Sequence, residues 1–86
     1  MSLALAPDLS ATDTDGGMVL LDQCTGRYWM LNRTGAATLR LALAGRSPEE
    51  VAAELTATAP EERARALTDV RTLLASLREA RLVVPA

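Results

Sequence analysis

The 86-residue chain has no histidine, lysine, phenylalanine or isoleucine, and only one cysteine, one tryptophan and one tyrosine. Without histidine it lacks the commonest general base and the commonest metal ligand. Its single thiol, Cys24, cannot form a disulfide within the chain and has no histidine to activate it. We therefore predict that the protein is not an enzyme and holds no cofactor and no metal.

The charge pattern disfavours nucleic acid as a partner. The net charge is -2 and the isoelectric point is about 5.0, whereas a nucleic-acid-binding domain usually carries a strongly basic surface. Residues 23–46 carry four arginines and no acid, but residues 47–59 carry three glutamates and no base. We expect no nucleic-acid partner.

The N-terminal segment shows no targeting signal. It has no basic flank, and its few apolar residues end at Pro7, which is too short for a signal peptide or a membrane span. A lone cysteine fits a reducing compartment. These observations predict a cytoplasmic protein without a membrane partner.

What the chain does contain favours helices. Sixteen alanines and fifteen leucines dominate the apolar residues, and a length of 86 suits one domain, residues 1–86. Turns at Asp15-Gly16-Gly17 and before Gly26 separate apolar runs in the first third, and the motif Ser47-Pro-Glu-Glu50 is a capping box that begins a helix. We predict an α+β fold, a three-stranded antiparallel sheet followed by three helices. The strands are expected at about 9–14, 18–22 and 27–31, the helices at about 34–44, 48–57 and 61–81, and residues 1–7 are expected to be flexible.

The run Arg27-Tyr-Trp-Met-Leu31 is the most informative stretch. A strand with one face in water alternates apolar and polar residues, yet here four large apolar side chains are consecutive. As the third strand of a meander it is also an edge, with unpaired backbone groups and no proline to block pairing. One hypothesis is that an extended peptide adds to this edge. The alternative is that Trp29 and Leu31 belong to the core, Tyr28 and Met30 are isolated surface residues, and a terminus covers the edge.

The predicted last helix carries a wide apolar stripe, which includes Val70, Leu73, Leu74 and Leu77. One part of it can pack inward while another lines a groove, although such a stripe is more often plain core. If it lines a groove, Arg71 and Arg78 lie at the rim and can pair with acids of a partner, although exposed arginines are more often simply solvated.

Three blocks of the sequence, spanning about residues 19–83, resemble PqqD-like proteins, the recognition elements of pathways that modify ribosomally made peptides. The blocks are TGRYWMLNRTGA, LALAGRSPEEVAAEL and DVRTLLASLREARLV. The most specific matches are Leu31-Asn32 before a helix, Gly45 before the capping box, and Asp69-Val70. The first block, after an aspartate-rich turn, is most similar to the stand-alone recognition proteins of lasso-peptide biosynthesis.

This resemblance implies a fold related to winged helix-turn-helix domains and a function in binding the leader segment of a precursor peptide. The leader would pair with the third strand against the third helix, for delivery to a separate leader-cleaving cysteine protease and then a cyclase. Arg81 stands where the family commonly has glycine, so the last helix is expected to lack the usual left-handed cap. Residue pattern and resemblance together assign peptide binding to Arg27, Tyr28, Trp29, Met30, Leu31, Asp69, Val70, Arg71, Leu73, Leu74, Leu77 and Arg78.

Three other functions stay open at this point. A PqqD-like carrier can serve a radical enzyme in another modified-peptide pathway. A winged-helix protein can bind DNA, but it needs basic residues on a recognition helix, and the predicted second helix has three glutamates and no base. A structural subunit can dimerise through the exposed strand.

Overall fold

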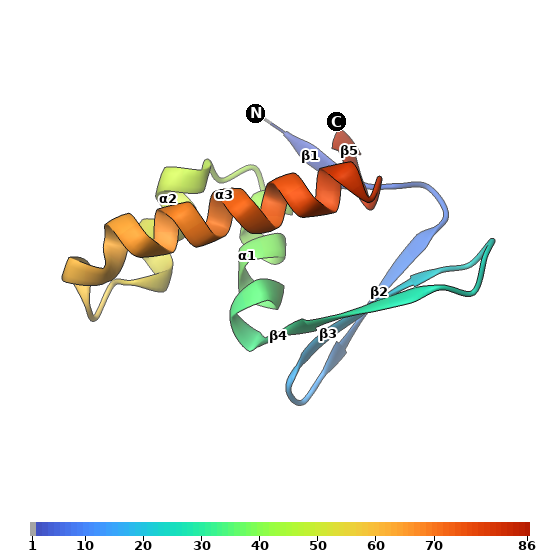
Figure 1. Ribbon diagram of the computed structural model, residues 1–86, viewed down its shortest axis with the longest axis horizontal. Coiled ribbons are helices and arrows are strands. Elements are labelled where there is room, and N and C mark those ends of the chain that lie inside the picture. Colours follow the sequence, from blue (N-terminus) through green and yellow to red (C-terminus); the bar gives the residue numbers. More distant parts are fainter. Residues whose placement is uncertain (1) are drawn as a thin grey trace.

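A computed structural model describes residues 2–86 and confirms the α+β fold (Figure 1). Helix α3 crosses α1, α2 packs beside the first half of α3, and the main sheet lies on the other side of α1. No helix within the described residues is long and apolar enough to span a membrane. The elements are β1 (Leu3–Leu5), β2 (Leu9–Thr14), β3 (Gly17–Asp22), β4 (Tyr28–Asn32), α1 (Arg33–Leu43), α2 (Pro48–Leu55), the 3-10 turn η1 (Pro60–Glu62), α3 (Arg63–Glu79) and β5 (Val83–Pro85).

The main sheet is an antiparallel meander in the order β2-β3-β4, which leaves β4 at an edge. Its three strands lie within about one residue of the expected ranges, because the turn residues that separate them act locally. In the register of the second hairpin, Leu20 pairs with Trp29 and Leu21 with Tyr28. Leu20 is completely buried, so its side of the sheet faces the helices.

The first two helices begin at side-chain caps. The Asn32 side chain accepts a hydrogen bond from the Gly35 N–H at 2.8 Å, which places the start of α1 directly after β4. The capping box of α2 is complete: Glu50 N–H donates to the Ser47 hydroxyl, and Ser47 N–H donates to the Glu50 carboxylate.

The third helix is shorter than expected. It was predicted over residues 61–81, but the chain first makes the 3-10 turn at Pro60–Glu62 and the α-helix ends at Glu79. Arg81 then adopts φ of 61°, and the N–H of Leu82 donates to the Leu77 carbonyl at 2.9 Å. This is the hydrogen bond of a Schellman cap. The expectation that an arginine at position 81 would remove the left-handed cap is therefore wrong, since Arg81 itself takes that conformation.

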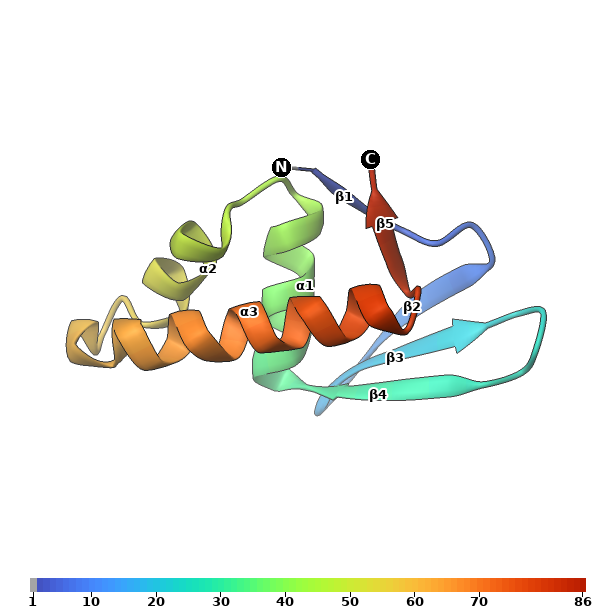
Figure 2. The ribbon, with the colours of Figure 1, turned by 45° about the horizontal axis from the view of Figure 1, so that its top comes forward.

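A second, two-stranded sheet was not predicted. β1 pairs antiparallel with β5, with Leu3 opposite Pro85, and Figure 2 shows the two strands above the C-terminal half of α3. The expectation of a flexible segment over residues 1–7 is wrong for the strand, because Leu3 is 92 % buried in the core. The Schellman cap supplies the reversal that brings Val83 back to this strand.

One hydrophobic core joins the two sheets and the three helices. Leu20, Leu39 and Val51 are completely buried at its centre, and Val70 brings α3 onto it. Trp29, Leu31 and Leu73 are only partly buried at the margin of the core, where β4 approaches α3. These three side chains therefore leave apolar surface exposed to solvent between β4 and α3.

Candidate functional site

Strand β4 exposes apolar surface on both faces and pairs on only one side. Trp29 and Leu31 are half-buried toward the helices, whereas 65 % of Tyr28 and 74 % of Met30 is exposed on the opposite face. Within residues 2–86 no strand pairs with the free side of β4, and the terminal strands pair with each other instead. A terminus therefore does not cover this edge, and its backbone groups can accept another strand.

A groove adjoins this edge. It has a volume of about 510 Å³ and lies between the end of β4, the first turns of α1, the end of α2 and one face of α3. We call it the β4–α3 groove, and its lining residues are Met30, Leu31, Asn32, Thr34, Gly35, Thr38, Leu55, Thr56, Ala66, Asp69, Val70 and Leu73.

The floor of the groove depends on the absence of a side chain at Gly35. A Cβ at this position would lie 3.2 Å from the Asn32 side-chain oxygen and 3.6 Å from a methyl carbon of Leu73. Glycine costs stability in a helix, so its presence in the first turn of α1 needs a reason, and the close approach supplies one. A Cβ at Gly35 would crowd the Asn32 cap and fill part of the floor, at ordinary contact distance from Leu73.

Most polar atoms in the groove already have partners. The hydroxyl of Thr38 donates to the Thr34 carbonyl at 2.9 Å, and that of Thr56 donates to the Ala52 carbonyl at 2.6 Å. Asp69 contributes the one carboxylate of the lining, and within residues 2–86 it forms no ion pair. The groove is thus suited to apolar side chains, with one exposed acid on its wall.

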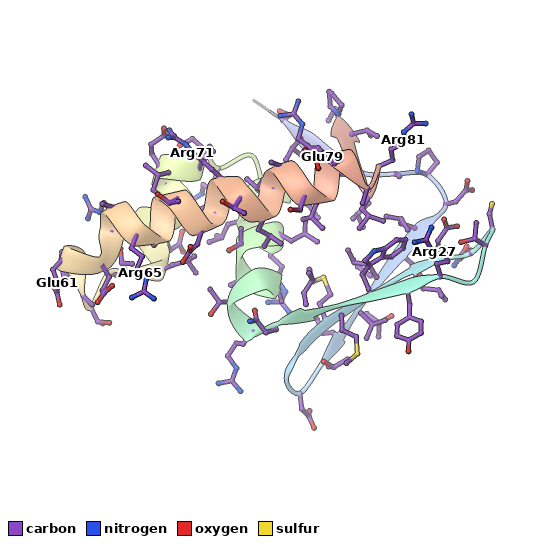
Figure 3. All side chains as sticks on the ribbon, in the orientation of Figure 1. Arg27, Glu61, Arg65, Arg71, Glu79 and Arg81 are labelled. Atoms are coloured by element: carbon purple, nitrogen blue, oxygen red, sulfur yellow. The ribbon has the colours of Figure 1, made fainter. Side chains whose placement is uncertain are left out.

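The structure places the predicted site residues in five locations. Arg27 and Trp29 lie at the far end of β4, where the guanidinium carbon is 5.5 Å from the centre of the indole, a cation–π contact (Figure 3 labels Arg27). Tyr28 is on the outer face of the sheet, and Leu77 is 96 % buried in the core. Within the β4–α3 groove the structure brings together Met30, Leu31, Asp69, Val70 and Leu73.

The remaining predicted residues lie on another face of α3. Arg71, Leu74 and Arg78 line a separate hollow of about 230 Å³ with Leu3 and Pro48. An Arg71 guanidinium nitrogen is 2.7 Å from a Glu49 carboxylate oxygen, and Figure 3 shows Arg71 beside α2. The predicted position of Arg71 and Arg78 at the rim of the groove is therefore not what the structure shows.

Helices α1 and α2 contribute to the groove, which the sequence pattern did not predict. Asn32, Thr34 and Thr38 come from the end of β4 and the first turns of α1, and Leu55 and Thr56 come from the end of α2. The available signal was Gly35, because a glycine in the first turn of a helix often marks a close approach.

The turn before β4 holds the single thiol. A hydrogen bond to Asp8, together with the negative charge of that carboxylate, raises the pKa of Cys24. Cys24 is exposed, and a raised pKa keeps it protonated, whereas a nucleophilic cysteine has a lowered pKa. Nearby, the backbone N–H of Cys24 donates to the Asp22 carboxylate at 2.9 Å and lowers the pKa of Asp22. No group of three or more potential metal ligands occurs within residues 2–86.

Comparisons with known proteins bear on the family and the fold. The family model described as Coenzyme PQQ synthesis protein D (PqqD) matches residues 17–83. A solved structure of lasso peptide synthetase B1 complexed with the leader peptide is 41 % identical, with a TM-score of 0.88, over 99 % of this chain and 100 % of that one. TbiB1 in complex with the TbiA(beta) leader peptide is 26 % identical, with a TM-score of 0.78, over 96 % of this chain and 94 % of that one. Comparison with curated proteins gave no match.

Proposed function

Because the chain belongs to the PqqD family, we propose that it binds the leader segment of a ribosomally made precursor peptide by strand addition to β4. The observation that carries this proposal is the unpaired edge of β4 beside the β4–α3 groove. Two similar proteins have been solved with leader peptides, and the more similar of them matches almost the whole of this chain.

The two parts of the site have different tasks. Backbone hydrogen bonds along β4 contribute about 1 kcal/mol each and do not depend on the side chains of the peptide. Two or three apolar side chains buried in the groove contribute roughly 1.5 to 3 kcal/mol each. These gains must exceed the several kcal/mol that association itself costs, so the affinity depends on how many apolar side chains the groove buries. Specificity therefore resides in the groove around Leu31, Val70 and Leu73.

We propose further that the protein is a carrier without catalytic activity in a lasso-peptide pathway. It delivers the leader to a separate leader-cleaving cysteine protease, and the cyclase then closes the ring. The absence of histidine and the raised pKa of the exposed Cys24 thiol support recognition rather than chemistry. The similarity to lasso peptide synthetase B1 supports the choice of pathway.

A second candidate is a peptide carrier for a radical enzyme, favoured by the description of the matching family as a coenzyme PQQ synthesis protein. Both candidates use the same edge and groove, so partner binding separates them. Duplex DNA binding is disfavoured because α2 carries Glu49, Glu50 and Glu54 without a basic residue.

The single tryptophan makes a direct test possible. The leader peptide encoded beside this chain is titrated against the protein while Trp29 emission is recorded, and calorimetry gives the affinity independently. We expect saturable binding with a change in emission, because Trp29 lies on the pairing strand. A scrambled leader of the same composition is the control. If neither measurement responds to the leader, the proposal is wrong.

A further inference from the structure

Two arginines without ion-pair partners stand at the two ends of β4. Arg27 precedes the strand, Arg33 follows it, and both are exposed. The other arginines of the basic stretch are neutralised: Arg40 pairs with Asp13, and Arg46 lies 3.4 Å from Glu54. Within residues 2–86 no carboxylate oxygen lies within 4 Å of a nitrogen of either end arginine.

The residues next to Arg27 and Arg33 in the chain supply no carboxylate that pairs with either arginine. Arg27 rests over the Trp29 ring, and the closest acid along the chain, Asp22, interacts with its charge but forms no ion pair with it and accepts hydrogen bonds from the backbone N–H groups of Cys24 and Thr25. The first turn of α1 contains no acid to neutralise Arg33. Both positive charges are therefore available to a strand laid along β4.

The charge between these ends has the opposite sign. Among the residues that the structure describes, Asp69 is the only carboxylate that lines the groove, so it repels an acid in the part of a peptide that fills the groove. A second copy of this chain is also a poor occupant of the edge. An antiparallel pair centred on Met30 sets Arg27 of one copy opposite Arg33 of the other, and like charges directly opposed destabilise strand pairing.

Resting on the proposed function, we infer that β4 selects a leader segment that has a carboxylate side chain at each end and no acid between. Arg27 and Arg33 are six positions apart, which corresponds to about 20 Å of extended chain. The matching acids of the leader are therefore about six residues apart. Backbone pairing does not discriminate between sequences, so these charges help to fix which stretch of the leader pairs with the strand.

The test compares Arg27→Gln, Arg33→Gln and the matched control Arg63→Gln, whose arginine begins α3 and lies outside the groove lining. Binding of the leader encoded beside this chain is followed by calorimetry and stopped-flow fluorescence. We expect each end variant to weaken binding about three- to tenfold, mainly through a slower association rate. Raising the salt concentration should reduce the affinity of the natural chain more than that of the double variant Arg27→Gln/Arg33→Gln.

Leader variants complete the test. Replacing the leader acid opposite Arg27 with glutamine should weaken binding to the natural chain and have little effect on Arg27→Gln. Arg27→Glu should regain affinity for a leader that carries arginine at that position. If the leader binds with equal affinity to all arginine variants, or has no acids about six residues apart, the inference is overturned while leader binding stands. If the leader does not bind at all, the proposed function fails first.

Discussion

Gly17 and Leu31 approach each other so closely that a Cβ on residue 17 would lie 1.9 Å from the Leu31 carbonyl oxygen. Gly17 also has φ of 154°, a conformation that residues with side chains rarely adopt. The two residues lie on neighbouring strands, where Gly17 pairs with Asn32. The end of β4, which opens onto the groove, is therefore positioned by the absence of a side chain on β3.

Gly17→Ala should destabilise the protein by about 2–4 kcal/mol, because β4 must move away to admit the methyl group. Urea denaturation followed by circular dichroism measures the change. Gly16→Ala is the matched control, since a Cβ at Gly16 meets nothing within 4 Å. Equal stabilities of the two variants would contradict the predicted clash.

Leu73→Ala and Leu74→Ala should separate binding from folding. Leu73 lines the β4–α3 groove, so its truncation should weaken leader binding about tenfold, a loss of about 1.4 kcal/mol. Leu74 is 92 % buried and lines the other hollow, so its truncation should cost about 2–4 kcal/mol of stability while the folded fraction still binds. Calorimetry and denaturation on both variants check this. If folded Leu74→Ala binds more weakly than Leu73→Ala, the peptide lies in the hollow beside Arg71 and not in the β4–α3 groove.

Arg81→Gly should stabilise the chain by about 1 kcal/mol. Arg81 occupies the left-handed region, which costs a residue with a Cβ roughly 1–2 kcal/mol more than glycine, and greater freedom of glycine in the unfolded chain offsets part of the gain. Arg81→Ala keeps the strain and serves as the control. Thermal denaturation should show a higher Tm for the glycine variant alone, and an unchanged Tm would argue against strain at this cap.

Glu50 should make the start of α2 sensitive to acid. The Ser47 N–H hydrogen bond lowers the pKa of Glu50 below its ordinary value of about 4.3. A lowered folded-state pKa stabilises the fold above the unfolded-state value, and this stabilisation is lost as the pH falls through the folded-state value. Glu50→Gln should therefore be less stable than the natural chain at pH 7, with a difference that shrinks below about pH 4.3. Denaturation at pH 7, 5 and 3 measures it, and a difference that is constant with pH would contradict the prediction.

Local signals explain what the sequence predicted well. Glycine turns delimit β2, β3 and β4, and the capping box marks the first residue of α2, because each signal acts over a few neighbouring positions. The edge position of β4 followed from this meander. Of the predicted site residues, Met30, Leu31, Asp69, Val70 and Leu73 line the groove, and their part in peptide binding stays a prediction.

The errors arose from contacts between distant parts of the chain. Leu3 pairs with Pro85, and no pattern near either residue indicates a partner at the other end of the chain. The spacing of residues on α3 correctly identified an apolar stripe, but it did not show that α2 packs beside Arg71. Helical periodicity gives the angle between side chains and not the identity of their neighbours.

The first and last described residues of the chain are joined by a hydrogen bond. The N–H of Ala86 donates to the carbonyl of Ser2 at 3.1 Å, so the chain from residue 2 to residue 86 forms a nearly closed ring. A short linker across this gap would allow new ends at the exposed turn of Asp15 and Gly16. Such a circular permutant keeps the β3-to-α3 segment that builds the groove uninterrupted, and the order in which β2 and β3 are synthesised is reversed.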